Sequence, residues 1–387
     1  MRIAHISDVH LGYRAYSRLT SRGINQREQD VLQAFRHALQ LALEQQPDLI
    51  LITGDLFHSV RPPNFSLVNA YRWLSKVQQE RNGAPLIIIA GNHETPRSTE
   101  SICILRLLGH IPGVQVADGG IESLRLDTLG VHALCIPARG LYTLPTTRIE
   151  PDPKAKVNLL LLHGILEGLT PYAVERPVSR QLILNDDWDY IALGDWHLYT
   201  QVAPNAIYAG ATEFTSTNIW EEAGKPKGFV LYDTDTRQHQ FLKVPTRAVY
   251  DLLPIDAREL TAPEINEQIR ARAESLDITN AVVRQRIYHL MPEQRSGLDG
   301  NLLRELRARA LHYYLDLRMY REARTMPKQN ALSDPNAGNP AGADEEGEPR
   351  LTLIEEWCEF ARRYELPPDV ERDELINLGV QYLSKIE

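Results

Sequence analysis

Five short motifs of aspartate, histidine and asparagine each follow an apolar run between residues 8 and 197. They are Asp8-Val9-His10, Gly54-Asp55, Gly91-Asn92-His93-Glu94, His163-Gly164 and Gly194-Asp195-Trp196-His197. Residues two apart at a strand end point to the same side, so Asp8 with His10 and Asp195 with His197 have the spacing of metal ligands. Carboxylate, imidazole and amide ligands without a thiolate suit Mn²⁺ better than Fe or Mg²⁺. The motifs therefore predict a divalent-metal centre.

Each motif alone has a simpler explanation. A single Gly-Asp pair often caps a helix or a turn, an Asp-x-His is commonly surface polarity, and Gly-Asn-His fits an ordinary turn. Asp55, however, follows a strand whose apolar residues indicate burial on both faces, and its carboxylate has two oxygens that can hold two metal ions. Five apolar strands that all end in potential ligands are difficult to attribute to chance.

The elements that must position these residues alternate between strand and helix. Strands are predicted at 2–7, 49–53, 85–90, 131–137, 157–162 and 189–193, and helices at 26–45 and 64–81. This alternation predicts an α/β fold with a layered sheet, because helices between parallel strands cover its faces. Ligands bind such sheets at the carboxyl ends of the strands, where the motifs lie.

The order of the motifs resembles that of the calcineurin-like metallophosphoesterases, and most closely their SbcD-type DNA repair exonuclease branch. Further matching features are HLGY from His10, Arg27 with Asp30, GDLFH followed by RPPN, and the late stretches IYAGATEF and KPKGFVLYD. The resemblance is strong over residues 1–243 and looser over the rest of the chain. It implies a metallophosphoesterase sandwich of mixed sheets flanked by helices.

The resemblance also implies roles for individual residues. The first of two divalent ions, most suitably Mn²⁺, would be held by Asp8, His10, Asp55 and His197. The second would be held by Asp55 as the bridge, with Asn92, His163 and Asp195. His93 would lie beside the scissile phosphate as general acid or charge stabiliser, and Glu94 could set its tautomer and pKa.

The final motif departs from the family pattern. Asp195 stands where the family usually has the first histidine of Gly-His-x-His, and Gly210-Ala211-Thr212 replaces a Gly-Ser. An aspartate can still bind metal, but it adds negative charge near the substrate phosphate and weakens the second ion as a Lewis acid. Activity or metal preference is therefore expected to differ from the family. His5 is expected to be a core residue, and no ligand role is predicted for His37, His110, His132, His239, His289 or His312.

Composition indicates a protein of several domains. The 387 residues carry a net charge of −9, which argues against a globally basic nucleic-acid wrapper. Residues 343–387 hold 13 acidic and 5 basic residues, so the preceding body is almost neutral. Three widely spaced cysteines suggest neither disulfides nor a thiolate site. No basic leader or long apolar run is present, so a cytoplasmic protein without a membrane segment is expected.

Residues 244–325 are predicted to form a small α+β domain, which resembles the capping domain that lies over the nuclease site in this family. Its elements would be a helix at 261–276 with a Thr261–Glu264 capping box, a strand at 281–290 and a helix at 301–324. Arginines flank the apolar stripe of the last helix and either form a solvated face or contact DNA phosphates. They are Arg304, Arg307, Arg318 and Arg321.

Residues 326–350 are rich in proline and glycine and predict a disordered linker, followed at 351–387 by two amphipathic helices. We expect this helical hairpin to bind an SMC-like ATPase of the SbcC type. The residues expected to contact it are Ile354, Trp357, Ala361, Tyr364, Ile376, Val380 and Leu383. Alternatively, the helices fold back on the nuclease domain or pair with each other.

The sequence therefore predicts a metal-dependent DNA exonuclease or endonuclease that hydrolyses phosphodiester bonds in double-strand break repair. Its expected partners are DNA and the ATPase, and the resemblance also allows a homodimer. Two alternatives remain: a phosphatase or cyclic-nucleotide phosphodiesterase on the same fold, and a DNA-binding scaffold subunit whose cleavage is impaired by Asp195.

Overall fold

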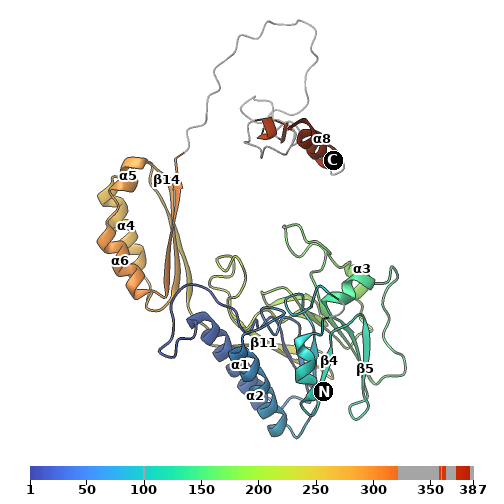
Figure 1. Ribbon diagram of the computed structural model, residues 1–387. Coiled ribbons are helices and arrows are strands. Elements are labelled where there is room, and N and C mark those ends of the chain that lie inside the picture. The colour runs from blue at the N-terminus through green and yellow to red at the C-terminus, as the bar shows by residue number, and fades with distance from the viewer. Residues whose placement is uncertain (99–100, 321–356, 359, 363–371, 384–387) are drawn as a thin grey trace, which may run out of the picture. The chain divides into compact units, whose positions relative to one another are not determined.

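The computed structural model describes residues 1–98, 101–320, 357–358, 360–362 and 372–383 (Figure 1). The chain forms two compact units, Met1–Arg321 and Glu322–Glu387. The predicted linker at 326–350 lies outside the described residues. Among the described helices, none combines the length and apolar character needed to cross a membrane.

The N-terminal part is built on two six-stranded sheets. In the first, the order is β12 (Gln238–Lys243), β11 (Gly228–Asp233), β1 (Arg2–Ile6), β2 (Leu49–Thr53), β3 (Leu86–Ile89) and β4 (Val114–Ala117). Strands β1 to β4 are parallel, and β11 and β12 complete the sheet in antiparallel fashion. The carboxyl ends of β1, β2 and β3 therefore lie at one edge.

The second sheet is also mixed. Its order is β5 (Glu122–Leu126), β6 (Val131–Ile136), β7 (Val157–His163), β8 (Tyr190–Gly194), β10 (Ala206–Tyr208) and β9 (Thr200–Ala203). Strands β6, β7, β8 and β10 are parallel, and one antiparallel strand lies at each edge. The sheets pack face to face through one apolar core, to which Leu51, Leu161 and Tyr190 belong. Because β2 contacts both β7 and β8, the carboxyl ends of the central strands of both sheets meet.

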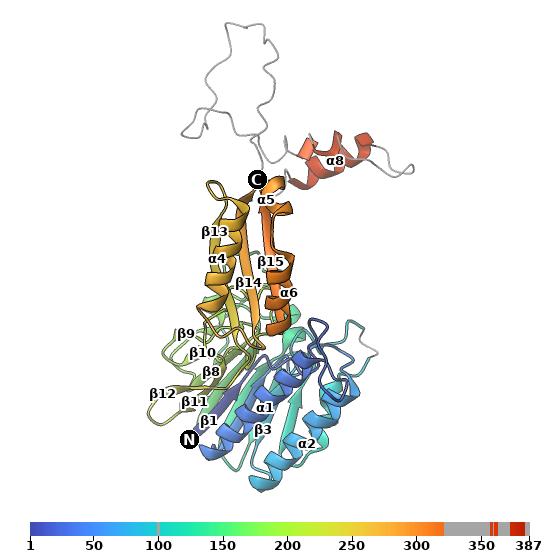
Figure 2. The same ribbon diagram turned by 90° about the vertical axis from the view of Figure 1, so that its left-hand side faces the viewer.

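Helices cover the outer faces of the sandwich. Helices α1 (Gln26–Glu44) and α2 (Asn64–Glu80) pack side by side on the first sheet (Figure 2). Shorter elements complete the fold: η1 (Ile104–His110), η2 (Ala138–Thr143) and α3 (Arg180–Ile183). The expected layered α/β sandwich of mixed sheets flanked by helices is confirmed.

Residues 249–319 form a separate layer with an apolar core of its own. Its elements are β13 (Val249–Asp256), α4 (Ala262–Glu274), β14 (Val282–Leu290), α5 (Pro292–Ser296), α6 (Gly300–Arg309) and β15 (His312–Met319). The three strands form a parallel sheet in the order β13-β14-β15, and α4 and α6 lie on one of its faces (Figure 2). Helix α4 begins with the predicted capping box of Thr261 and Glu264.

The prediction of a single long helix at 301–324 is wrong. Helix α6 ends at Arg309, Ala310 has an extended backbone, and β15 follows. The apolar residues Tyr313, Leu315 and Leu317 recur every two residues, which is the period of a strand. Aromatic residues at 313 and 314 also favour a strand over a helix.

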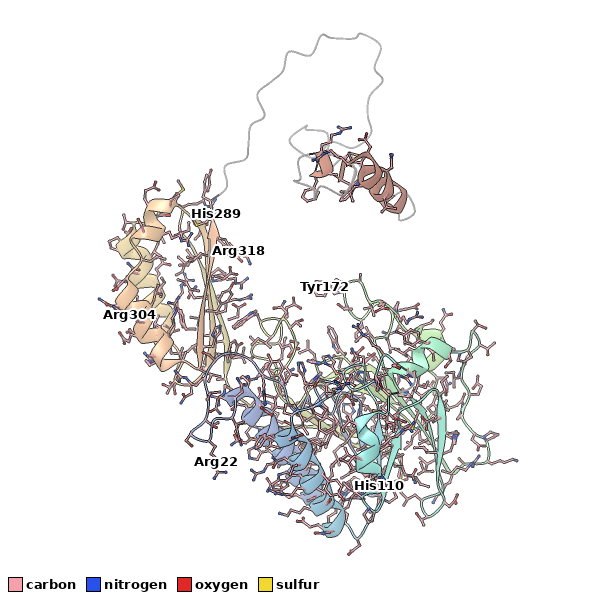
Figure 3. The ribbon with its side chains drawn as sticks, in the orientation of Figure 1. Arg22, His110, Tyr172, His289, Arg304 and Arg318 are labelled. Atoms are coloured by element: carbon pink, nitrogen blue, oxygen red, sulfur yellow. The ribbon has the colours of Figure 1, made fainter. Side chains whose placement is uncertain are left out.

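This correction separates the arginines that had been expected to share one helix. Arg304 and Arg307 lie on α6, whereas Arg318 lies on β15 and forms an ion pair of 3.0 Å with Asp316. Figure 3 shows Arg304 on the helical side of the layer and Arg318 on the strand side. Arg321 lies outside the described residues. Contact of these side chains with DNA stays a prediction.

A buried ionic network joins the sandwich to this layer. Arg27, which is 1% exposed, donates to Asp30 at 2.9 Å and to Glu213 at 3.2 Å. Arg247 also donates to Asp30, at 2.5 Å, and reaches the Asn280 carbonyl at 2.6 Å. Arg27 and Asp30, which resemble the nuclease branch in sequence, therefore anchor the connection to residues 249–319.

In the C-terminal unit, α8 (Arg372–Leu383) contacts residues 357–362. The Trp357 Nε1 donates to the Ile376 carbonyl at 3.2 Å, and a Cβ added at Gly379 would lie 2.0 Å from this indole. The described helical segments thus pack against each other, one of the alternatives considered above. Ile354, Tyr364 and the side chain of Leu383 lie outside the described residues, and binding of an ATPase stays a prediction.

Candidate metal centre

The carboxyl ends of β1, β2, β3, β7 and β8 deliver all the predicted ligands to one place. Backbone bonds fix their loops: Asp8 N donates to Gly54 O at 3.2 Å, and His10 N donates to Asp55 O at 2.8 Å. Across the sheets, the Asp195 amide donates to the Asp8 carboxylate at 3.1 Å. The structure therefore brings the sequence-predicted ligands together.

One group consists of Asp8, His10 and His197, whose ligand atoms lie within 4.8 Å of one another. His10 Nε2 and His197 Nε2 are 3.0 Å apart, and Asp55 Oδ2 is 3.7 Å from His10 Nε2. Asp8, His10 and Asp55 are at most 1% exposed. These are the residues expected to hold the first ion.

A second group gathers around His163 Nε2. The Asn92 side-chain amide lies 3.1 Å from this nitrogen, Asp55 Oδ2 lies 3.6 Å from it and Asp195 Oδ1 lies 3.7 Å from it. Asp55 Oδ2 thus faces both His10 and His163, as a bridging ligand requires. Asp8 also lies within 4.8 Å of Asp55 and His163, so it contributes to both groups.

The chemistry of this cluster fits divalent cations. Burial raises the pKa of the Asp8 and Asp195 carboxyls above their ordinary values. Burial also disfavours the charged form of Asp55, but the neighbouring His163 holds its pKa well below the usual range. Burial lowers the pKa of His10, so its ring is neutral and offers a lone pair. Cations would offset the carboxylate charges and accept the converging lone pairs.

The backbone of several ligands is strained. Asp8, His10, Asp55 and Asp195 have φ angles of 49°, 56°, 51° and 89°. This left-handed region costs a non-glycine residue on the order of 1–3 kcal/mol and persists where the surrounding structure enforces it. Its concentration at the ligands indicates that the fold is organised around this centre.

The glycines that precede three ligands are required by close packing. A Cβ at Gly54 would lie 2.0 Å from His163 Nδ1, and one at Gly91 would lie 2.1 Å from Asp55 Oδ1. At Gly194 it would lie 2.0 Å from the Thr53 carbonyl oxygen. The Gly-Asp and Gly-Asn motifs therefore reflect contact between neighbouring ligand loops.

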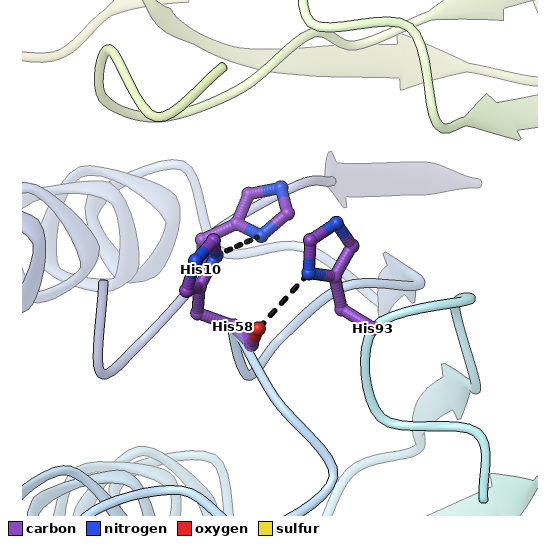
Figure 4. Close-up of side chains that lie close together, drawn as sticks. All are labelled: His10, His58 and His93. Atoms are coloured by element: carbon purple, nitrogen blue, oxygen red, sulfur yellow. Dashed lines mark hydrogen bonds between the residues drawn. The ribbon is translucent and has the colours of Figure 1, made fainter. Parts of the chain in front are cut away.

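His93 stands at the open side of the cluster, with 36% of its side chain exposed. Its Nδ1 lies 2.9 Å from the carbonyl oxygen of His58 (Figure 4). Because a carbonyl only accepts, Nδ1 carries the proton and Nε2 faces the centre, 4.0 Å from Asp55 Oδ2. His93 can therefore hold or release a proton at Nε2 beside the cluster.

With this geometry established, the comparison with known families is decisive: the family described as Calcineurin-like phosphoesterase matches residues 1–199. The chain belongs to this family. It is also similar to proteins named DNA double-strand break repair protein Mre11. The relative from Sulfurisphaera tokodaii is 27% identical, with 79% of this chain and 76% of the relative covered. The relative from Methanopyrus kandleri is 26% identical, with 73% of this chain and 65% of the relative covered. The relative from Methanocaldococcus jannaschii is 31% identical, with 60% of this chain and 62% of the relative covered.

In this phosphoesterase Glu94 does not set the tautomer of His93 as the sequence suggested, because the His58 carbonyl does so. Glu94 is fully buried, and its Oε1 accepts from the amides of Leu56 at 3.2 Å and Gly91 at 3.3 Å. Burial raises its pKa well above the ordinary value. Glu94 therefore joins the loops that carry Asp55 and Asn92.

The sequence reasoning missed three residues of the centre. The His58 ring stacks on His93 with 5.0 Å between centroids, and its Nδ1 lies 3.3 Å from His10 Nδ1. Glu222 Oε1 lies 3.6 Å from His197 Nδ1. Lys227 Nζ donates to Glu222 Oε2 at 2.6 Å and to the His197 carbonyl at 2.8 Å. His58 lies in GDLFH and Lys227 lies in KPKGF, two stretches to which no role had been assigned, whereas Glu222 lies in neither.

Proposed function

We propose that this phosphoesterase is a nuclease that hydrolyses phosphodiester bonds of DNA during double-strand break repair and uses two Mn²⁺ ions. The observation that carries the proposal is the position of Asp55 Oδ2 between the groups around His10 and His163, with His93 at the open side. The names of the similar Mre11 proteins support the choice of DNA as substrate.

Asp8, His10, Asp55 and His197 would hold one ion, and Asp55, Asn92, His163 and Asp195 the other. When bound, a pair of divalent ions would supply the positive charge that stabilises the attacking and leaving oxygens of an in-line displacement. The protein supplies the buried carboxylates, the fixed imidazoles and the tight loops that keep these ligands in place.

His93 would act on the leaving oxygen. Its Nδ1 is tied to the His58 carbonyl, so a proton on Nε2 of the cationic ring points toward the centre. Transfer of this proton neutralises the oxygen as its bond to phosphorus breaks, a contribution that is typically about 10²–10⁴-fold. Stacking on His58 holds the plane of the His93 ring.

The proposal is tested by assaying the purified chain with Mn²⁺ on linear duplex DNA, single-stranded DNA and a phosphomonoester. We expect metal-dependent cleavage of DNA and little release of phosphate from the monoester. Preference for the monoester would identify a phosphatase. DNA binding without cleavage would identify the scaffold alternative, for which the extra negative charge of Asp195 is the specific supporting observation.

The partner proposal concerns the C-terminal unit. We propose that its paired helices bind an SMC-like ATPase of the SbcC type, as amphipathic helices bind in a groove. Deletion of residues 351–387 should abolish copurification with the ATPase and leave Mn²⁺-dependent cleavage intact. Unchanged affinity after deletion would assign binding to another surface. We also propose that the chain forms a homodimer and that it is located in the cytoplasm.

A further inference from the structure

A short segment of turns lies between the metal centre and the layer of residues 249–319. It follows β10, and backbone hydrogen bonds close its turns. Glu222 N donates to Ile219 O at 3.2 Å, and Ala223 N donates to Trp220 O at 3.3 Å. Because these bonds join Trp220 and Glu222 in one hydrogen-bonded unit, a displacement of the first residue also displaces the second.

Trp220 connects this segment to the layer. Its ring stacks on Tyr314 of β15 with 6.5 Å between centroids, and the guanidinium carbon of Arg284 on β14 lies 4.9 Å from the indole centroid. Asp251 of β13 holds Arg284 with two hydrogen bonds of 3.0 and 2.9 Å. Asp251, Arg284 and Tyr314 are paired across the three strands, so Trp220 contacts a row that spans the sheet. Ile219 beside it is buried in an apolar cluster that includes residues of the layer.

Glu222 connects the same segment to the metal centre. Its Oε1 lies 3.6 Å from His197 Nδ1, just beyond hydrogen-bond distance, and among the described residues this buried nitrogen makes no hydrogen bond. Lys227 holds the other carboxylate oxygen at 2.6 Å, so the approach of Oε1 to His197 depends on where the backbone of Glu222 lies. A backbone shift of a few tenths of an ångström therefore makes or breaks the hydrogen bond that orients His197.

We propose that Trp220 is a positioning residue through which the layer of residues 249–319 sets the metal affinity of the centre. Contact with the sheet holds Trp220, the segment keeps Glu222 beside His197, and the His197 ring is oriented for an ion. Loss of the contact releases the segment and lowers this affinity. Coupling between sites is reciprocal, so a bound ion also stabilises the contact. The inference rests on the proposed metal-dependent function, to which it adds control of the ions by the layer.

The test compares Arg284→Ala, Trp220→Ala and Trp220→Phe with the wild-type full chain. Arg286→Ala is the matched control, because both arginines donate to Asp251 Oδ2 at 2.9 Å. Arg284 lies over Trp220, whereas Arg286 lies over Tyr288, 6.0 Å from its ring centroid. Mn²⁺ affinity is measured by isothermal titration of the metal-free chain, and stability by urea unfolding. Cleavage of linear DNA is assayed separately in saturating Mn²⁺.

Trp220→Ala should weaken one of the two Mn²⁺ binding steps about tenfold, because outer partners of a metal-binding histidine contribute about 10–100-fold. Arg284→Ala should weaken the same step about fivefold, the lower end of typical coupling between sites. Trp220→Phe keeps an aromatic face for Arg284 and should recover most of the affinity. Arg286→Ala should match wild type in Mn²⁺ affinity, although it loses a comparable ion pair with Asp251.

A double-mutant cycle shows whether the effect passes through Glu222. If it does, Arg284→Ala should cause no further loss of Mn²⁺ affinity in the Glu222→Gln background. Additive losses in the double variant would overturn the proposal. Equal losses of affinity in Arg284→Ala and Arg286→Ala would also overturn it, because they indicate a general loosening of the layer.

The outcomes also separate this coupling from the nuclease function. Unchanged Mn²⁺ affinity in Trp220→Ala and Arg284→Ala, together with Mn²⁺-dependent cleavage of DNA, would overturn the coupling and leave the nuclease function standing. The expected losses of affinity in a chain that cleaves no DNA would support the coupling and overturn the nuclease function. If Trp220→Ala does not fold, Arg284→Ala and its control decide alone.

Discussion

Replacement of Glu222 by glutamine tests how His197 is held. Glu222 is 6% exposed, with Oε1 at 3.6 Å from His197 Nδ1 and Oε2 at 2.6 Å from Lys227 Nζ. His197 Nε2 faces the metal centre, so Nδ1 is the nitrogen that a carboxylate can orient. Such outer partners of a metal-binding histidine contribute about 10–100-fold to metal affinity. Glu222→Gln should therefore weaken Mn²⁺ binding by about 1.4–2.7 kcal/mol.

The same substitution leaves a buried cation without its partner. The Lys227 side chain is 0% exposed, and loss of one member of a buried ion pair destabilises a protein by about 3–5 kcal/mol. Glutamine keeps an oxygen acceptor for Lys227, so the lower end of this range is expected. Adding Lys227→Met should recover much of the stability without restoring metal affinity, which separates the two effects.

Isothermal titration with Mn²⁺ measures the affinity, and urea unfolding of the metal-free protein measures the stability. Glu221→Gln is the control, because this neighbouring carboxylate is exposed and interacts with Tyr172 and Asn218. Mn²⁺ affinity of Glu222→Gln within about threefold of the control would refute the positioning role of Glu222.

Three further predictions follow from the centre and the core. His93→Ala should keep both metals and lower the cleavage rate by about 10²-fold or more, whereas Asp55→Ala should lose metal. Equal metal loss in the two variants would show that His93 is a ligand. Asp195→His should keep two metals and raise or broaden activity, and an unchanged metal count in Asp195→Ala would remove Asp195 from the ligand set. Burial lowers the pKa of His5 to about 3 from 6.5. The unfolded chain therefore takes up a proton that the folded chain refuses as pH falls below 6.5, and stability should drop by about 2 kcal/mol between pH 7 and pH 5. In His5→Gln this part of the pH dependence of the unfolding free energy, measured by urea unfolding, should vanish. An equal pH dependence in the wild-type and His5→Gln proteins would assign it to other titrating groups.

Much of the metal centre was predictable because parallel strands impose a common direction on their ends. Apolar runs before Asp8, Asp55 and Asn92 indicated buried strands, and strand order then brought their carboxyl ends together. His5 was also assigned correctly to the core, where its ring contacts Tyr190 and Thr53 at 2.7 and 2.8 Å.

The missed features depend on contacts that local sequence does not encode. Glu222 and Lys227 meet His197 only after the loop beyond β10 folds back on the centre. The tautomer of His93 is set by a backbone carbonyl, which has no sequence signature, so the adjacent Glu94 was credited instead. At 310–319 the apolar residues fit both a helical stripe and an alternating strand, and parallel pairing of β15 with β14 decided for the strand.

The central claim is that Asp55 bridges two metal ions at the meeting point of the two sheets. Anomalous diffraction at the manganese edge, from crystals of the full chain grown with Mn²⁺, tests it most directly. We predict two peaks about 3.5–4 Å apart, one among Asp8, His10 and His197 and the other beside Asn92 and His163, with Asp55 between them. A single peak, or peaks that do not contact Asp55, would contradict the account.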